Sequence, residues 1–81
     1  MKMNIDEWIK LANQNREVDF YYEGNKYSVS VSQSGRWFLT KYNDCESEQE
    51  FNSFLSLIYK SNINGINFID ICTEFDIDAI Y

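Results

Sequence analysis

The chain has 81 residues and a formal net charge of −6, and 44% of its residues are hydrophobic and 17% aromatic. This length favours one domain over residues 1–81, and the aromatic content excludes a disordered chain because each aromatic side chain supplies a large surface to bury. Two cysteines are too few for the disulfide framework of a small secreted protein, and no stretch approaches the roughly 18 apolar residues of a membrane span. We therefore expect a soluble cytoplasmic protein with two free thiols.

The charge is distributed unevenly along the chain. Residues 1–41 contain six basic and five acidic side chains, whereas residues 42–81 contain eight acidic side chains and only Lys60, a net charge of −7. A surface this negative repels nucleic-acid phosphates and attracts a basic protein surface. We expect a basic protein as the partner and no direct binding of nucleic acid.

The first element predicted is an amphipathic helix over about residues 4–14. Asn4 and Glu7 have the spacing of a capping box at its start. Apolar residues then recur at helical spacing, which places this helix on a core. They are Ile5, Trp8, Ile9 and Ala12.

Alternating apolar residues next predict a β-hairpin, with Gly24-Asn25 as its two-residue turn. The alternation places the apolar side chains of both strands on one face of the sheet. The pairs expected from this turn are Tyr22 with Tyr27, Phe20 with Val29, and Val18 with Val31.

Ser34-Gly35 predicts a second turn, which leads into a third strand. A two-residue loop turns Trp37 and Leu39 to the face of the serines in segment 28–32, and a loop one residue longer reverses that assignment. With the shorter loop, Trp37 is exposed and is a candidate partner-binding residue, because an exposed Trp is a frequent interface anchor. The other aromatic residues expected in the core are Phe20, Tyr22, Phe38, Phe51 and Phe54.

The segment NDCESEQEF, residues 43–51, places four acids at alternate positions: Asp44, Glu46, Glu48 and Glu50. Ser47 and Glu50 form a second capping-box pattern, which predicts a helix from Ser47 with an apolar stripe after it. Glu48 and Glu50 then complement the helix dipole, whereas Asp44 and Glu46 precede the helix and are not explained by capping. The four acids and Trp37 are the predicted partner-binding residues. The stripe consists of Phe51, Phe54, Leu55 and Ile58.

A loop, SNINGIN at 61–67, separates this helix from a shorter one capped by Asn67. Segment 76–81 is either a frayed turn or a short strand. The order predicts an α+β domain with a helix, a three-stranded antiparallel sheet and two helices packed on the sheet. The apolar stripe expected on the last helix is Phe68, Ile71, Cys72 and Phe75.

The residue types argue against catalysis and metal binding. The chain has no His, so the usual general base and every imidazole ligand are missing, and neither Cys45 nor Cys72 has a His to activate it. The acidic segments 44–50 and 76–81 lack the glycine turn and terminal Glu of an EF-hand loop. We expect no enzyme activity, no cofactor and no metal.

The residues MNIDEWIK at 3–10, with the length, the acidity and the element order, resemble the small phage anti-CRISPR inhibitors of type II effector nucleases. The resemblance implies an inhibitor in the host cytoplasm that mimics DNA charge and occupies the basic site where the nuclease reads its short duplex motif. In that family, acids on the loop between the second and third strands help to engage the nuclease. This chain has QSGR there, at 33–36, so the binding acids expected here are those of residues 44–50.

A structural or assembly module is the alternative function. Such a protein forms homo-oligomers by pairing exposed sheet edges. The chain is then expected to be a homodimer, whereas the inhibitor can be a monomer. Salt separates the two functions, because phosphate mimicry weakens steeply with salt and apolar association does not.

Overall fold

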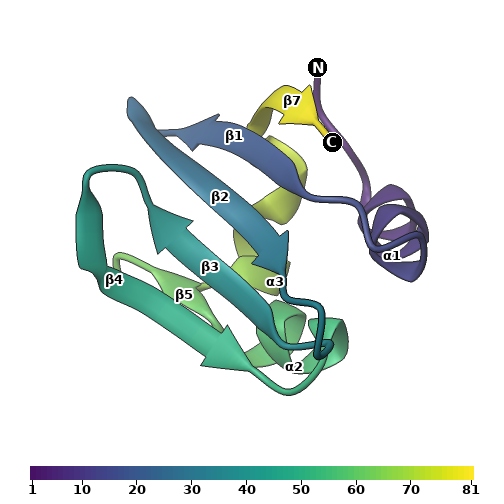
Figure 1. Ribbon diagram of the computed structural model, residues 1–81. Coiled ribbons are helices and arrows are strands. Elements are labelled where there is room, and N and C mark those ends of the chain that lie inside the picture. Colours follow the sequence, from purple (N-terminus) through teal and green to yellow (C-terminus); the bar gives the residue numbers. More distant parts are fainter.

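The largest element of the structure is an antiparallel sheet of five strands, with three α-helices packed against one face (Figure 1). The computed structural model describes residues 1–81. The strands are β1 (Val18–Tyr22), β2 (Asn25–Val31), β3 (Trp37–Lys41), β4 (Asp44–Phe51) and β7 (Asp76–Ile80). They lie in the order β4-β3-β2-β1-β7. The predicted α+β class is confirmed, but the count of three strands is wrong because β4 and β7 extend the sheet at its two edges.

The helices are α1 (Ile5–Asn13), α2 (Phe54–Lys60) and α3 (Phe68–Ile71), and α3 continues into a 3₁₀ turn over Cys72–Glu74. None of them has the length and apolar character needed to cross a membrane. Between α2 and α3, the strands β5 (Asn62–Ile63) and β6 (Ile66–Asn67) form a separate small hairpin where the sequence predicts a loop.

Helix α1 begins with the capping box that the sequence predicts. The Asn4 side chain accepts a hydrogen bond from the Glu7 backbone N–H (2.9 Å), and the Glu7 carboxylate accepts one from the Asn4 N–H (3.1 Å). Trp8 and Ala12 are buried, so the apolar stripe faces the core. The prediction of this helix is confirmed.

The first hairpin has the predicted faces but a different register. Its loop consists of Glu23 and Gly24, with φ of 49° and 80°, as a type I′ turn requires. Phe20 therefore pairs with Tyr27, and its predicted pairing with Val29 is wrong, as are the other two pairs. The true register differs by two residues, which returns every side chain to the same face. The alternating pattern cannot distinguish two such registers.

The loop between β2 and β3 is longer than the preferred prediction, and its length decides where Trp37 lies. Val31 pairs with Trp37, so the loop contains the five residues 32–36. This odd length turns Trp37 and Leu39 to the inner face of the sheet, where they are 6% and 1% exposed, and Phe38 to the outer face. The expectations of an outward Trp37 and a core Phe38 are both wrong.

The core lies between the inner face of the sheet and the helices, with Trp8 at its centre. The rings of four phenylalanines have centroids 5.2–6.5 Å from that of Trp8, and three of the four contacts are edge-to-face. The stripe predicted at residues 68–75 is fully buried, Cys72 included, so that prediction is confirmed. The four phenylalanines around Trp8 are Phe20, Phe54, Phe68 and Phe75.

Candidate functional site

The four acids of the NDCESEQEF segment lie on strand β4, at one edge of the sheet. The helix predicted to begin at Ser47 is therefore wrong. All four acids are exposed, and from residue 46 to residue 51 exposed positions alternate with half-buried ones. The structure thus brings Asp44, Glu46, Glu48 and Glu50 together along one edge strand.

Two features hold this segment as a strand. Asn43 adopts a left-handed φ of 63° and, with Tyr42, forms the two-residue loop between β3 and β4. The Gln49 side chain donates to the Asn62 carbonyl (2.8 Å) and accepts from the Asn62 N–H (3.0 Å), which ties β4 to β5. The Tyr42-Asn43 loop is the signal that the sequence analysis missed, since Asn tolerates this conformation better than most residues.

Ser47 stabilises an irregular part of the strand and does not cap a helix. Its hydroxyl donates to the Asp44 carbonyl (2.7 Å) and accepts the Lys41 N–H (3.0 Å), at the point where the pairing of β3 with β4 shifts. The helix cap is Ser53, whose side chain accepts from the Ser56 N–H (3.1 Å) at the start of α2.

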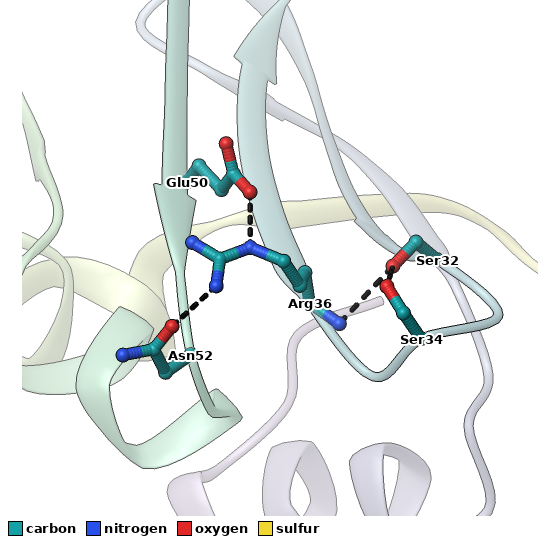
Figure 2. A network of polar contacts seen from close by, with 5 residues as sticks. All are labelled: Ser32, Ser34, Arg36, Glu50 and Asn52. Carbon is teal, nitrogen blue, oxygen red and sulfur yellow. Dashed lines mark hydrogen bonds and ion pairs between the residues drawn. The ribbon is translucent and has the colours of Figure 1, made fainter.

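One of the four acids is paired within the protein (Figure 2). The guanidinium group of Arg36 forms an ion pair with Glu50 and a hydrogen bond with Asn52. The Arg36 backbone N–H donates to the Ser32 hydroxyl (3.1 Å), which lies 2.9 Å from that of Ser34. The Arg36 and Glu50 side chains are 44% and 46% exposed, so the pair adds little to stability. It does remove Glu50 from the free negative charge of β4.

Three of the acids that form no ion pair, Asp44, Glu46 and Glu48, follow one another closely on β4. The protein has two further ion pairs, and both lie on β7, where Lys2 contacts Asp76 (3.1 Å) and Lys26 contacts Asp78 (3.3 Å). Basic residues from the N-terminal half of the chain thus compensate the acids of one sheet edge. The acids at the start of the other edge stay free.

Trp37 does not lie with these acids. Its ring packs edge-to-face against Phe54, with 5.0 Å between the ring centroids, in the core on the inner face of the sheet. A side chain that is 6% exposed has almost no surface to offer a partner. The expectation that Trp37 acts as an exposed binding anchor is therefore wrong.

A second group of side chains, which the sequence analysis missed, gathers on the outer face of the sheet. The hydroxyls of Tyr42 and Tyr81 both donate to one carboxylate oxygen of Asp19, at 2.8 and 2.9 Å, and Asp19 is only 3% exposed. The ammonium nitrogen of Lys26 lies 4.6 Å from the ring centroid of Tyr42 and 5.8 Å from that of Tyr21. We call these five residues the tyrosine cluster. Its members come from two strands, β1 and β2, from the turn after β3 and from the C-terminal residue, so no local sequence pattern predicts it.

Hydrogen bonds shift the titration of this cluster. The bond to Asp19 raises the pKa of the Tyr42 and Tyr81 hydroxyls, because a tyrosinate has no proton to donate to the carboxylate. The bond to Asp78 raises the pKa of Lys26, because it stabilises the charged ammonium. The cluster therefore keeps its hydrogen bonds and its internal cation at neutral pH.

The remaining reactive side chains are the two cysteines. Cys72 is buried, and burial raises the pKa of its thiol, whereas Cys45 is exposed on β4 beside the acids. No three Cys, Asp or Glu side chains lie together in a group able to hold a metal ion. What the surface offers a partner is negative charge and exposed aromatic rings.

Comparison with known proteins adds no family: no protein-family model, no curated protein and no solved structure matches the chain. The resemblance of residues 3–10 to the anti-CRISPR inhibitors therefore stays a prediction. Within the fold, this segment has clear local roles. Asn4 and Glu7 cap α1, and Met3 and Trp8 are buried in the core. The acids predicted to bind a partner lie elsewhere, on β4.

Proposed function

We propose that this protein is a non-enzymatic inhibitor that occupies the basic, DNA-binding site of a CRISPR effector nuclease by mimicking DNA charge. The observation that carries the proposal is the acidic edge strand β4, on which Asp44, Glu46 and Glu48 are exposed and form no ion pair. Lys41 is the cross-strand neighbour of Asp44 but forms no ion pair with it. Such a nuclease reads its short duplex motif with arginines and holds nucleic acid in a positive channel. Free carboxylates on an exposed edge complement such a site and favour fast encounter with it.

The spacing of the acids limits how much charge alone can do. In a regular extended strand, carboxylates on alternate residues are about 6.8 Å apart, which is twice the ~3.4 Å rise per phosphate along one DNA strand. The irregular pairing of β4 between Asp44 and Gln49 makes this an approximate spacing for the acids. The acidic edge thus has roughly half the linear charge density of a single DNA strand. To compete with DNA, the protein needs contacts in addition to the β4 acids.

The positions of the acids disfavour the alternative of a homo-oligomer joined at sheet edges. Both edge strands, β4 and β7, carry exposed acids. Pairing two copies along β4 places its unpaired acids near one another, which is destabilising, and charged edge strands are a common protection against such pairing. On β7 the acids Asp76 and Asp78 are each paired with a lysine, so the repulsion there is weaker. We expect a monomer, and light scattering after size exclusion measures it directly.

The proposal is tested by competition for DNA. Guide-loaded type II effector nucleases are mixed with a labelled target duplex and increasing amounts of the protein, and bound duplex is measured by fluorescence anisotropy. We expect the protein to displace the duplex from at least one nuclease, and rising salt to weaken its binding to that nuclease in the absence of DNA. Failure to displace DNA from any of them would exclude this function.

A further inference from the structure

The outer face of the sheet carries aromatic surface that the core does not use. Tyr21, Tyr42 and Tyr81 are 41%, 43% and 64% exposed, whereas the helices and all of the large buried side chains lie on the other face. Figure 1 shows this open face across β1, β2 and β3. Exposed tyrosines grouped on one face, and fixed there, are a feature of binding surfaces.

The tyrosine cluster already holds a cation. The ammonium nitrogen of Lys26 lies within 6 Å of the ring centroids of both Tyr42 and Tyr21, the range of a cation–π interaction, and 3.3 Å from an Asp78 carboxylate oxygen. The site thus has the two components that a positive group requires, a ring face and a carboxylate. Tyr21 and Tyr42 stay 41% and 43% exposed, so part of each side chain remains accessible to a partner.

Two of the three exposed tyrosine rings, those of Tyr42 and Tyr81, are fixed before any partner binds. The two hydroxyl bonds to Asp19 hold Tyr42 and Tyr81 in place, and the buried carboxylate cannot turn away. Preorganised side chains lose little conformational entropy on binding. This favours a docking surface over a set of tyrosines that only cover the sheet.

Charge decides which partner fits. Acids border the open face on β4, where Asp44, Glu46 and Glu48 form no ion pair, while those of β7 are paired with lysines. The β4 acids therefore repel an acidic partner or a nucleic acid. Arginine suits the face better than lysine, because its planar guanidinium stacks on aromatic rings and sheds its water more easily.

We propose that the open face binds arginine side chains of a basic partner, which stack on Tyr21 and Tyr42 while the β4 acids contact neighbouring cations. This inference rests on the proposed function and names a second part of its interface. Five strands of this length present an open face of roughly 400 Å², about half of the ~800 Å² that each partner contributes to a standard interface. The open face and its acidic edge β4 therefore form one continuous surface that supplies about half of what one partner contributes to a standard interface.

The test compares two peptides of equal length and charge, oligo-arginine and oligo-lysine, titrated into the full chain at low salt. We expect the native protein to bind the arginine peptide about threefold more tightly, since only guanidinium groups stack well. Tyr21→Ala with Tyr42→Ala removes this preference, whereas Tyr21→Phe with Tyr42→Phe retains it because the rings remain. Tyr59→Ala is the matched control, since Tyr59 is 62% exposed on α2, in the helical layer.

The outcomes separate this inference from the proposed function. Equal binding of the two peptides by the native protein, or a preference that survives the double alanine variant, overturns the stacking surface and leaves the β4 acids as the binding site. Binding of neither peptide at low salt overturns both. Circular dichroism checks folding, and Tyr21→Ala alone replaces the double variant if that unfolds, because Tyr21 takes no part in the Asp19 hydrogen bonds.

Discussion

The two faces of the sheet differ in the burial and the chemical character of their side chains. On the inner face, Trp37, Leu39 and Phe20 are almost fully buried against the helices, and burial alone accounts for them. The outer face and its β4 edge carry serines, exposed tyrosines and unpaired acids, which contribute little to a core. The buried apolar surface that stabilises the fold thus belongs mainly to one face, while the other face leaves tyrosines and acids exposed to solvent.

The largest difference in stability between the two faces is expected at two adjacent residues of β3. Trp37→Ala removes a buried ring and should cost about 3–5 kcal/mol in the free energy of unfolding, while Phe38→Ala, on the outer face, should cost less than about 1 kcal/mol. Urea titration followed by fluorescence or circular dichroism measures both. Equal losses at the two positions would show that the outer face is part of the core.

Alkaline pH tests the hydrogen bonds of the outer face. The pKa values of Tyr42 and Tyr81 are raised in the folded state, so the unfolded chain loses these protons first as the pH rises. Their stabilising contribution is complete below a pH of about 10 and is lost as the pH rises through the folded-state values. We expect the free energy of unfolding to fall in this range, and to fall less steeply in Tyr42→Phe with Tyr81→Phe. An identical pH profile in that variant would mean that the bonds to Asp19 add no stability.

The irregular part of β4 offers a smaller test. Ser47→Ala should lower the free energy of unfolding by about 1 kcal/mol, because the Lys41 N–H loses its acceptor and the Asp44 carbonyl its donor. Ser53→Ala, which removes the α2 cap, should have a similar cost. Amide hydrogen exchange distinguishes the two, since Ser47→Ala exposes the Lys41 amide and Ser53→Ala exposes that of Ser56. Faster exchange at the start of α2 in the Ser47 variant would contradict this assignment.

The smallest effect is expected inside the core, at Ser61. Its side-chain oxygen is fully buried and has no hydrogen-bond partner. Because Ser61→Ala removes a polar atom that is buried at a cost, it should leave the free energy of unfolding unchanged or raise it by up to about 1 kcal/mol. Thermal unfolding measures the change, and a clear loss of stability would reveal a bond that the hydroxyl makes.

Much of the inner face was predictable from sequence, because buried apolar residues recur at the regular spacing of a helix or a strand. The spacing of Trp8 and Ala12 predicted α1, and the stripe at residues 68–75 predicted the last buried helix. The register of the β1–β2 hairpin was not predictable in this way, because registers that differ by two residues bury the same side chains.

The candidate site was predictable only in part. The acids of segment 44–50 were identified by charge, but a capping-box pattern at Ser47 predicted a helix there, and only strand pairing and the contact of Gln49 with Asn62 make it a strand. The tyrosine cluster joins Asp19 to Tyr81, 62 residues apart in sequence, and no local pattern carries such a contact.

The central claim is that the acids at the start of β4 bind the partner. Charge reversal at an interface replaces attraction with repulsion and costs several kcal/mol, so Asp44→Lys with Glu46→Lys should leave the fold intact and greatly weaken binding. The matched control is Asp70→Lys with Glu74→Lys, which makes the same change of charge at exposed positions of α3 and the 3₁₀ turn.

The decisive measurement is the concentration at which each variant displaces the target duplex from a guide-loaded type II effector nuclease at low salt. The account predicts that the β4 variant needs at least about a hundredfold more protein than the native chain, while the control variant stays within a few-fold of it. Equal potency of the native protein and the β4 variant would contradict the account, provided that circular dichroism shows both to be folded. The acids would then serve only to protect an edge strand from pairing with another chain.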